Sequence, residues 1–277
     1  MKQLKTTSVL LLLSLLFSCQ KEETTIVFDH SFAGAKLDSL VRIDANTYEA
    51  FIFPAFEPVN KSPYFAFSIT SKKNVEIDVK LNYGNYTHRY IPKLSTDKKV
   101  WSKIKKENIK IDTVTGTASL KLKVGPEKLF LAAQEIESSE DTYLWMNTLL
   151  NSHPEIKKLI AGKTAKGKNN YCLEIENKKN KNAIALIARQ HPPEIPGGTF
   201  GFKAFYETML SDSEIAKKFR NHFNIYTFPL FNPDGVDMGN WRHNANGKDL
   251  NRDWIDFSQP ETKMAKSYFE KKVREGQ

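Results

Sequence analysis

The spacing of apolar and polar residues divides the chain into two regions of different secondary structure. From about Thr24 to Ala133, apolar residues mostly alternate with polar ones, which is the period of a strand with one buried face. The alternation predicts strands at residues 64–70, 75–81, 118–124 and 129–132, with short turns rich in glycine, proline or asparagine between them. Repeated short strands of this kind favour a small antiparallel β-sandwich.

From about residue 134 onward the pattern changes to helices that alternate with strands. Strands are predicted at residues 171–176, 183–188 and 224–228, and the second is an unbroken apolar run of the type buried on both faces of a sheet. Helix starts are predicted at Ser138 or Ser139, at Thr199, and in the capping-box sequences Ser211-Asp212-Ser213-Glu214 and Ser258-Gln259-Pro260-Glu261. The first two helices should bury Leu144, Trp145, Leu149 and Leu150, and Phe202, Phe205, Tyr206 and Met209. This order predicts an α/β fold that begins an open mixed sheet.

The first 19 residues have the character of an export signal. Lys2 and Lys5 precede an apolar run from Val9 to Phe17, and Ser18-Cys19 follows. A basic segment, a short apolar segment and a small residue before the cut describe a secretory signal. The run is too short for a spanning helix, which needs about 20 apolar residues.

The sequence Leu16-Phe17-Ser18-Cys19 resembles a bacterial lipobox, in which the cysteine is acylated and becomes the new N-terminus. We therefore predict a signal peptide over residues 1–18 and a lipidated Cys19 with a tether over residues 19–23. The protein would be exported and anchored to a bacterial outer membrane, and Gln20-Lys21-Glu22-Glu23 resembles a signal that sends some lipoproteins to the outer surface. The alternative is an ordinary signal with an unmodified cysteine. Cys172 is the other cysteine, so no internal disulfide is expected, and we interpret it as a buried apolar residue.

Composition and charge narrow the classes of protein. Of 277 residues, 40% are hydrophobic and 26% charged, which is typical of soluble globular domains and excludes a disordered or collagen-like chain. Lysine and arginine total 41 against 32 aspartate and glutamate, for a formal net charge of +9. The excess is spread along the chain and accompanies no nucleic-acid recognition motif, so we predict no nucleic-acid partner.

Polar residues gather just past the ends of two predicted strands, where ligands bind in open α/β sheets. Arg189-Gln190-His191-Pro192-Pro193-Glu194 follows one strand, and Asn232-Pro233-Asp234-Gly235 follows the other. An imidazole and a carboxylate side by side are what zinc takes in a hydrolytic site, so His191 and Glu194 are candidate metal ligands. His153-Pro154-Glu155 has a different spacing at the end of a predicted helix, and we assign it no function.

The second block continues with two arginines. It reads from Asn232 to Arg242 and then Gly247-Lys248-Asp249-Leu250-Asn251-Arg252-Asp253-Trp254. The NPDG sequence favours a tight turn. Arg242 and Arg252 offer planar forks that can grip a carboxylate or a developing oxyanion. We expect Asn232, Asp234 and Asp249 to brace the loop and to pair with these arginines.

Over about residues 138–266, the chain resembles the zinc carboxypeptidase family, closest to the branch of cytosolic carboxypeptidases and their bacterial relatives. The resemblance rests on HPPE at residues 191–194, on PxxNPDG at 229–235, and on GNWR at 239–242 followed by GKDLNRDW at 247–254. The resemblance implies a Zn²⁺ cofactor held by His191 and Glu194. It implies that Arg242 stabilises the oxyanion as metal-activated water attacks the scissile carbonyl. Asn251 and Arg252 would bind the free C-terminal carboxylate of a peptide or protein.

The resemblance also implies a domain division, with a β-sandwich domain over residues 24–133 and the N-terminal portion of a zinc carboxypeptidase domain over residues 134–277. The family's third zinc ligand is a later histidine and its general base a later glutamate, and we find no residue here that matches either position. We therefore expect a truncated chain that is inactive on peptides and poorly soluble. Two other functions stay open: a non-catalytic surface lipoprotein that acts as a binding module, and a zinc amidase acting on cell-wall peptides.

Overall fold

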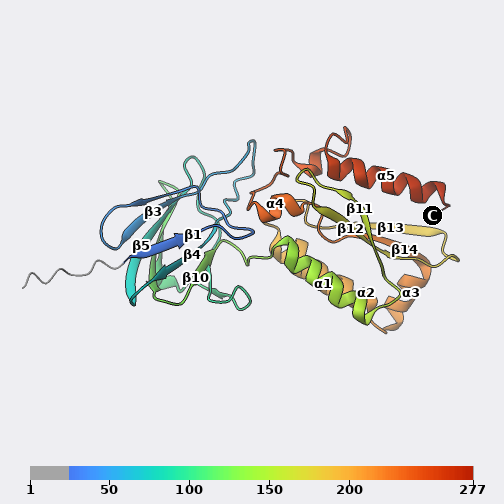
Figure 1. The fold of residues 1–277 in the computed structure, drawn as a ribbon, viewed down its shortest axis with the longest axis horizontal. Helices are drawn as coiled ribbons and strands as arrows, with labels where there is room; N and C mark the ends of the chain where they lie inside the picture. The colour runs from blue at the N-terminus through green and yellow to red at the C-terminus, as the bar shows by residue number, and fades with distance from the viewer. Residues whose placement is uncertain (1–24, 277) are drawn as a thin grey trace, which may run out of the picture.

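A computed structural model describes residues 25–276 of the chain. Two five-stranded sheets come first, and a four-stranded sheet with helices on both faces follows (Figure 1). The predicted signal peptide, Cys19 and the tether lie outside the described residues. Among residues 25–276, no helix combines the length and apolar character needed to cross a bilayer.

The β-sheet region consists of strands β1 to β10 and pairs almost entirely antiparallel. One sheet has the order β1 (Ile26–Asp29), β4 (Ala66–Ser71), β10 (Leu129–Ala132), β6 (Lys93–Ser95) and β7 (Ser102–Lys103). The other has the order β2 (Ser39–Arg42), β3 (Thr47–Phe51), β5 (Val75–Asn82), β9 (Thr117–Val124) and β8 (Ile109–Asp112), with a short 3₁₀ helix at Lys106–Asn108. The pairing of β3 with β5 is parallel, and the other pairings are antiparallel.

The core of the β-sheet region is built from the apolar positions of the predicted strands. Phe67 and Ile69 on β4 are fully buried, as are Val79 and Leu81 on β5. Because successive side chains of a strand point to opposite faces, the alternating pattern of β5 and β9 puts their apolar residues inward. The predicted strands differ from the observed ones by at most two residues at either end. The sequence analysis did not identify β1, β2, β3, β6, β7 or β8, most of which are short.

The second part of the chain is the α/β region, whose sheet has the order β11 (Lys157–Lys163), β12 (Asn169–Ile175), β14 (Phe223–Phe228) and β13 (Asn182–Ile187). Only β13 and β14 pair in parallel. The helices are α1 (Ser139–Ser152), α2 (Phe202–Leu210), α3 (Glu214–His222), α4 (Pro233–Asp237) and α5 (Pro260–Arg274), with a π-helical turn at Pro196–Gly201 and a 3₁₀ turn at Leu250–Arg252. Figure 1 shows α5 on one side of the sheet and α1 and α2 on the other.

Two apolar clusters hold these layers together. Side chains of α1 and α2, such as Met146 and Tyr206, pack with Leu173 and Ile225 on one face of the sheet. Met264 of α5 belongs to the cluster on the other face. The parallel pairing of β13 and β14 brings their carboxyl ends to the same edge. The residues that follow each strand therefore meet there.

Several predicted helix starts need correction. Ser138 caps α1 as predicted and forms a capping box with Asp141. Thr199 is not an N-cap, because it lies inside the π-helical turn that runs directly into α2. The cap of α3 is Ser213, not Ser211, and α5 begins after Gln259, whose side chain makes no capping bond.

Two residues of the predicted buried stripes are exposed. Leu144 of α1 is 57% exposed and Phe205 of α2 is 49% exposed. Each helix buries a narrower stripe than the sequence suggested, centred on Met146 in α1 and on Tyr206 in α2. The sequence analysis also did not identify β11, whose burial pattern is irregular along its length.

Candidate active site

The loop that follows β13 brings a histidine and a glutamate together. This HPPE loop (residues 188–195) begins where β13 ends, and its two prolines limit its backbone freedom. The His191 side chain is only 11% exposed, whereas that of Glu194 is 53% exposed. His191 Nδ1 lies 2.8 Å from Glu194 Oε1. The two candidate ligands therefore face each other across one turn of the loop.

The other nitrogen of His191 contacts an aspartate from the second block. His191 Nε2 lies 2.9 Å from Asp249 Oδ1, and Arg242 donates through Nε to Asp249 Oδ2 at 2.7 Å. The Asp249 and Arg242 side chains are both 13% exposed. One carboxylate thus bridges the imidazole and the guanidinium, and it places Arg242 beside the pair formed by His191 and Glu194.

The pKa values of His191 and Asp249 are shifted in opposite directions. Burial acts to lower the pKa of His191, but the hydrogen bonds to Glu194 and Asp249 outweigh it, so the pKa is raised. Burial acts to raise the pKa of Asp249, and the hydrogen bonds from His191 and Arg242 outweigh it, so the pKa is lowered. Asp249 is therefore ionised at neutral pH and accepts hydrogen bonds from both neighbours.

The NPDG sequence forms the short helix α4, not a simple turn. Asn232 caps α4 by accepting a hydrogen bond from Gly235 N at 3.0 Å. The amide nitrogen of Asn232 donates to the carbonyls of Gln190, at 3.0 Å, and His243, at 3.3 Å. Asn232 therefore ties the HPPE loop to the segment that carries Arg242.

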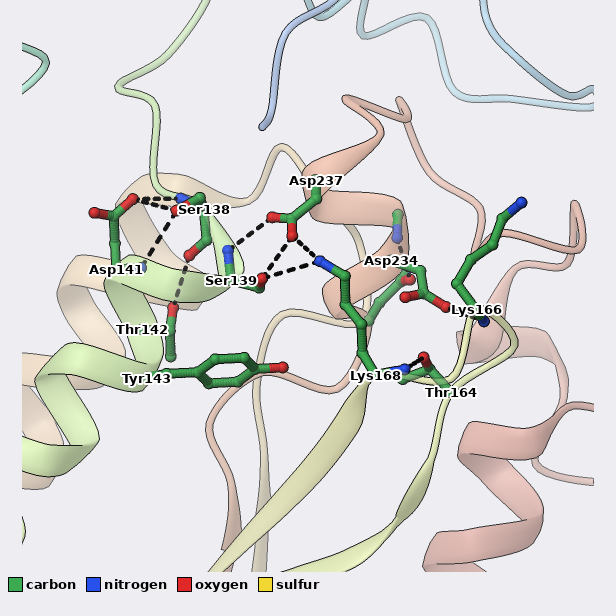
Figure 2. Close-up of polar contacts among 12 residues, drawn as sticks. Ser138, Ser139, Asp141, Thr142, Tyr143, Thr164, Lys166, Lys168, Asp234 and Asp237 are labelled. Carbon is green, nitrogen blue, oxygen red and sulfur yellow. Dashed lines mark hydrogen bonds and ion pairs between the residues drawn. The ribbon is translucent and has the colours of Figure 1, made fainter. Parts of the chain in front are cut away.

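The aspartates of α4 do not pair with arginines, which corrects one of our expectations. Asp234 is buried and accepts a hydrogen bond from the backbone nitrogen of Lys166 at 2.8 Å. Asp237 accepts from the backbone and hydroxyl of Ser139 at the start of α1, and it pairs with Lys168 (Figure 2). Both carboxylates point from α4 toward α1 and the turn between β11 and β12. Of the three expected braces, only Asp249 pairs with an arginine.

Asn251 and Arg252 lie on the 3₁₀ turn that follows Asp249. The Asn251 backbone nitrogen donates to Asp249 Oδ1 at 2.9 Å, which fixes the start of the turn. The side chains of Asn251 and Arg252 are exposed, and the Arg252 guanidinium donates to the carbonyl of Asn251 at 3.1 Å. The structure thus places them next to Asp249 in the chain, on the solvent side of the site.

The β-sheet region packs directly against the segment around Arg242. Trp241 belongs to its core and meets Tyr86 edge to face, with ring centroids 5.3 Å apart. On the other side of Arg242, the buried His243 ring lies 6.0 Å from that of Phe56. Gly247 has a φ of 77°, and a Cβ there would lie 2.7 Å from the Phe56 ring, so close approach requires glycine.

Both the sequence and the fold of this chain are similar to those of known proteins. Residues 142–275 match the zinc carboxypeptidase family, and they include His191, Glu194, Arg242, Asp249, Asn251 and Arg252. The chain carries a zinc carboxypeptidase domain. A 74-residue stretch is 43% identical to cytosolic carboxypeptidase 2 of Xenopus tropicalis, covering 27% of this chain and 8% of that protein.

Solved structures show that the likeness in fold extends beyond the zinc carboxypeptidase domain. The metallo-carboxypeptidase of Pseudomonas aeruginosa superposes with a TM-score of 0.76 at 20% identity, over 88% of this chain and 66% of its own. That of Burkholderia cenocepacia gives 0.74 at 19% identity, over 89% and 67%. The matched part includes most of the β-sheet region. The chain thus spans about two thirds of the length of these neighbours and a small part of the curated relatives.

The donor set of the zinc carboxypeptidase domain fits zinc chemistry. Zinc accepts neutral imidazole nitrogen and carboxylate oxygen, and a ligating imidazole commonly donates its other N–H to a carboxylate. His191 has Nε2 on the ionised Asp249, which leaves Nδ1, facing Glu194, as the electron-pair donor. Within residues 25–276, no group of three or more His, Cys, Asp or Glu side chains is arranged to hold a metal. His191 and Glu194 therefore supply two metal donors, and the Asp249 carboxylate supports the imidazole of His191.

The sequence analysis underestimated the roles of two residues of this site, Asp249 and Arg189. Asp249 was expected to brace the loop and to pair with an arginine, which it does through Arg242, but its contact with His191 was not predicted. Arg189 received no role, although it is buried and donates to the HPPE loop. The available signal for Arg189 was a charged residue directly after an apolar strand. An arginine there must either reach solvent or find buried acceptors.

Proposed function

We propose that this chain belongs to a zinc metallocarboxypeptidase that removes C-terminal residues from peptides or proteins. One observation carries the proposal: a single carboxylate, Asp249, holds both the imidazole of His191 and the guanidinium of Arg242. A metal-ligand pair and a fixed cation beside it are the two groups needed to activate water and to stabilise the charge that develops on a carbonyl oxygen.

Each residue has a role that its position supports. Zinc bound by His191 and Glu194 would supply a Lewis acid and activate water. Arg242 is oriented through Nε by Asp249, and among the described residues its Nη groups contact no protein acceptor, so they can donate to the scissile carbonyl oxygen. The exposed Arg252, with Asn251, would grip the terminal carboxylate of the substrate, which restricts the reaction to chain ends.

The metal pair is tested by zinc titration of the purified chain in a calorimeter. His191→Ala and Glu194→Ala each remove one donor, and both should reduce zinc affinity at least tenfold, because losing even a residue that only orients a metal ligand costs ~10–100-fold. His153→Ala is the matched control, because His153 Nδ1 also lies near a glutamate, 3.2 Å from Glu155 Oε1, but outside the site. Equal zinc affinity in all three variants would contradict the proposal.

The carboxylate site is tested by binding of peptides with a free or an amidated C-terminus. The wild-type chain should bind the free acid more tightly, and Arg252→Ala should remove the difference. (2-Guanidinoethylmercapto)succinic acid, which is bound in the Pseudomonas aeruginosa structure, is a second probe, because it carries carboxylates. Loss of its binding in Arg252→Ala but not in Arg274→Ala, at the distant end of α5, would support the assignment.

We further propose that the chain of 277 residues has no zinc-dependent peptidase activity by itself, because its described residues bring only two donors to the metal. Zinc-dependent release of C-terminal amino acids should not exceed that of His191→Ala. Robust release would overturn the proposal that this chain is inactive by itself.

The presence of only two metal donors among the described residues also favours a second candidate function, a non-catalytic binding module. Binding of free-acid peptides that zinc does not strengthen would favour the module over a peptidase site.

A further inference from the structure

Arg189 is a buried arginine at the first bend of the HPPE loop. It is 4% exposed and has a φ of 57°, in the left-handed region that residues other than glycine rarely adopt. Its carbonyl accepts a hydrogen bond from Asn232 N at 3.2 Å, and the preceding residue, Ala188, pairs with Phe228 at the end of β14 and with Phe231 beyond it. The bend therefore begins where the sheet pairing ends, and it turns the chain toward His191.

The guanidinium of Arg189 joins three separate segments. Nε donates to the carbonyl of Pro192 at 2.8 Å, and Nη1 donates to the hydroxyl of Thr199 at 2.6 Å. Nη2 donates to the carbonyl of Glu137 at 3.3 Å. These acceptors lie in the HPPE loop, in the π-helical turn after it, and in the segment that connects the β-sheet region to α1.

The contact at Pro192 bears directly on the metal pair. Pro192 lies between His191 and Glu194, so the carbonyl that Arg189 holds belongs to the backbone that carries both candidate ligands. Gly198 of the π-helical turn packs on the same group: a Cβ there would lie 3.2 Å from Glu194 Cβ and 3.7 Å from Arg189 Cδ. The loop is thus fixed on one side by the guanidinium and on the other by the π-helical turn.

The third contact is itself held in place. The carboxylate of Glu137 pairs with Lys203 at the start of α2, so the carbonyl that accepts from Arg189 belongs to an anchored residue. All three acceptors of Arg189 are neutral oxygens. A buried cation without a carboxylate partner is costly, and burial lowers the pKa of Arg189 to about 10, which still leaves it charged at neutral pH.

We propose that Arg189 is a positioning residue, which fixes the HPPE loop so that His191 Nδ1 and Glu194 Oε1 converge. The inference rests on the proposed function, because it concerns the geometry of the same two ligands. Lysine cannot replace Arg189, since an ammonium group is a point charge and lacks the planar fork that reaches three acceptors in different directions.

The test uses Arg189→Lys, Arg189→Met and Thr199→Val in the full chain. Thr199→Val keeps the side-chain shape and removes one acceptor, so it remains informative if the arginine variants fail to fold. The matched controls are Arg220→Lys and Arg220→Met. Arg220 also donates to backbone carbonyls, those of Met209 and Ser211, but at the junction of α2 and α3.

Two measurements are made on each variant besides its urea denaturation curve. The first is the NMR signal of the His191 ring, whose nitrogens report hydrogen bonding to Glu194 and Asp249 without any metal. The second is zinc affinity. Arg189→Lys and Arg189→Met should alter the His191 ring signals and lower zinc affinity about tenfold, the lower end of the range for residues that orient metal ligands. Thr199→Val should shift both in the same direction by less.

The outcomes separate the two proposals. An unchanged His191 ring in Arg189→Met, or an equal change in an Arg220 variant of matched stability, would overturn the positioning role. If the wild-type chain binds no zinc, the proposed function fails, and the ring signals still decide on Arg189. If Arg189→Lys retains both the wild-type ring signals and the wild-type zinc affinity, the need for the planar fork is refuted.

Discussion

Asp249 and His191 are 58 residues apart in the chain and are joined by a 2.9 Å hydrogen bond between Oδ1 and Nε2. This bond connects the loop after β13 to the segment that follows α4, and so it unites the two blocks of polar residues at the edge of the sheet. Because the other oxygen of Asp249 accepts from Arg242, the geometry of the imidazole and that of the guanidinium depend on one side chain.

Asp249→Ala should therefore disturb two groups at once. His191 loses the carboxylate that fixes its tautomer, and Arg242 loses its partner. We expect zinc affinity to fall by about 10–100-fold, as for other carboxylates that support a ligating histidine. Zinc titration measures the change, and Asp256→Ala, at an exposed position of the same segment, is the control. Wild-type affinity in Asp249→Ala would remove the carboxylate from the site.

The strand ends where the site lies could be predicted from the sequence, because they follow from local patterns of residues. The alternation of β5 and β9 reports burial residue by residue, and the prolines and glycines after the strands mark where they end. The apolar run of β13 correctly predicted a strand, but burial on both faces was wrong, because β13 lies at the edge of its sheet and its residues are exposed or half-buried. His191 and Glu194 could be proposed for the same reason. They lie three residues apart in one loop, so their proximity does not depend on the rest of the fold.

The parts that sequence reasoning missed depend on contacts between distant segments. Thr199 has the residue type of an N-cap, but its hydroxyl accepts from Arg189 inside a π-helical turn, and the helix passes through it without interruption. The role of Asp249 likewise requires the pairing of two loops 58 residues apart. A single sequence does not reveal such pairings, because its local pattern is the same with or without them.

A second aspartate of the same segment, Asp253, caps α5 from a distance. Its fully buried carboxylate accepts from Ser258 and Gln259 backbone nitrogens, at 3.1 and 2.9 Å, and also from the hydroxyl of Thr262. Asp253→Ala leaves these donors unsatisfied. We expect the free energy of unfolding to fall by about 2–4 kcal/mol, the range for losing a cap together with charge-assisted hydrogen bonds.

Urea denaturation measures this loss, and zinc affinity below the transition should stay near that of the wild type, because Asp253 contacts neither ligand. Asp256→Ala again serves as the control for removing an aspartate from the segment. A stability equal to that of the wild type would show that α5 does not depend on the cap.

His88 should make the β-sheet region sensitive to acid. Its ring lies against Tyr83, with Nδ1 2.9 Å from the hydroxyl, and burial lowers the pKa of His88 to about 4. The unfolded chain binds this proton near the ordinary value of ~6.5, so the folded state is progressively disfavoured as pH falls from about 6.5 toward 4. Above that window the group has no effect on stability.

Thermal unfolding midpoints measured between pH 7.5 and 4.5 test whether His88 destabilises the folded state as pH falls. His88→Gln keeps a polar side chain that cannot take up the proton, so its midpoint should fall less than that of the wild type across this interval. His30→Gln, at an exposed position of the same region, should fall as much as the wild type. Parallel curves for the wild type and His88→Gln would contradict the assignment.

Cys172 should be unreactive in the folded chain. It is fully buried on β12, and burial raises the pKa of its thiol to about 12, whereas alkylation requires the thiolate. In a Cys19→Ser chain produced without export, a thiol reagent should therefore label almost no protein until denaturant is added, and then label Cys172. Rapid labelling under native conditions would show that the sheet around β12 opens readily.

The same reagent tests the proposal that Cys19 is lipidated. Protein exported with its own leader should show no reactive thiol in detergent and only Cys172 after denaturation, because acylation consumes the thiol of Cys19. The denatured chain produced without export should instead show two thiols, since the sequence holds two cysteines. Two thiols in the denatured exported protein would contradict lipidation, and the loss of one thiol from the denatured, unexported Cys19→Ser chain would confirm which cysteine lipidation consumes.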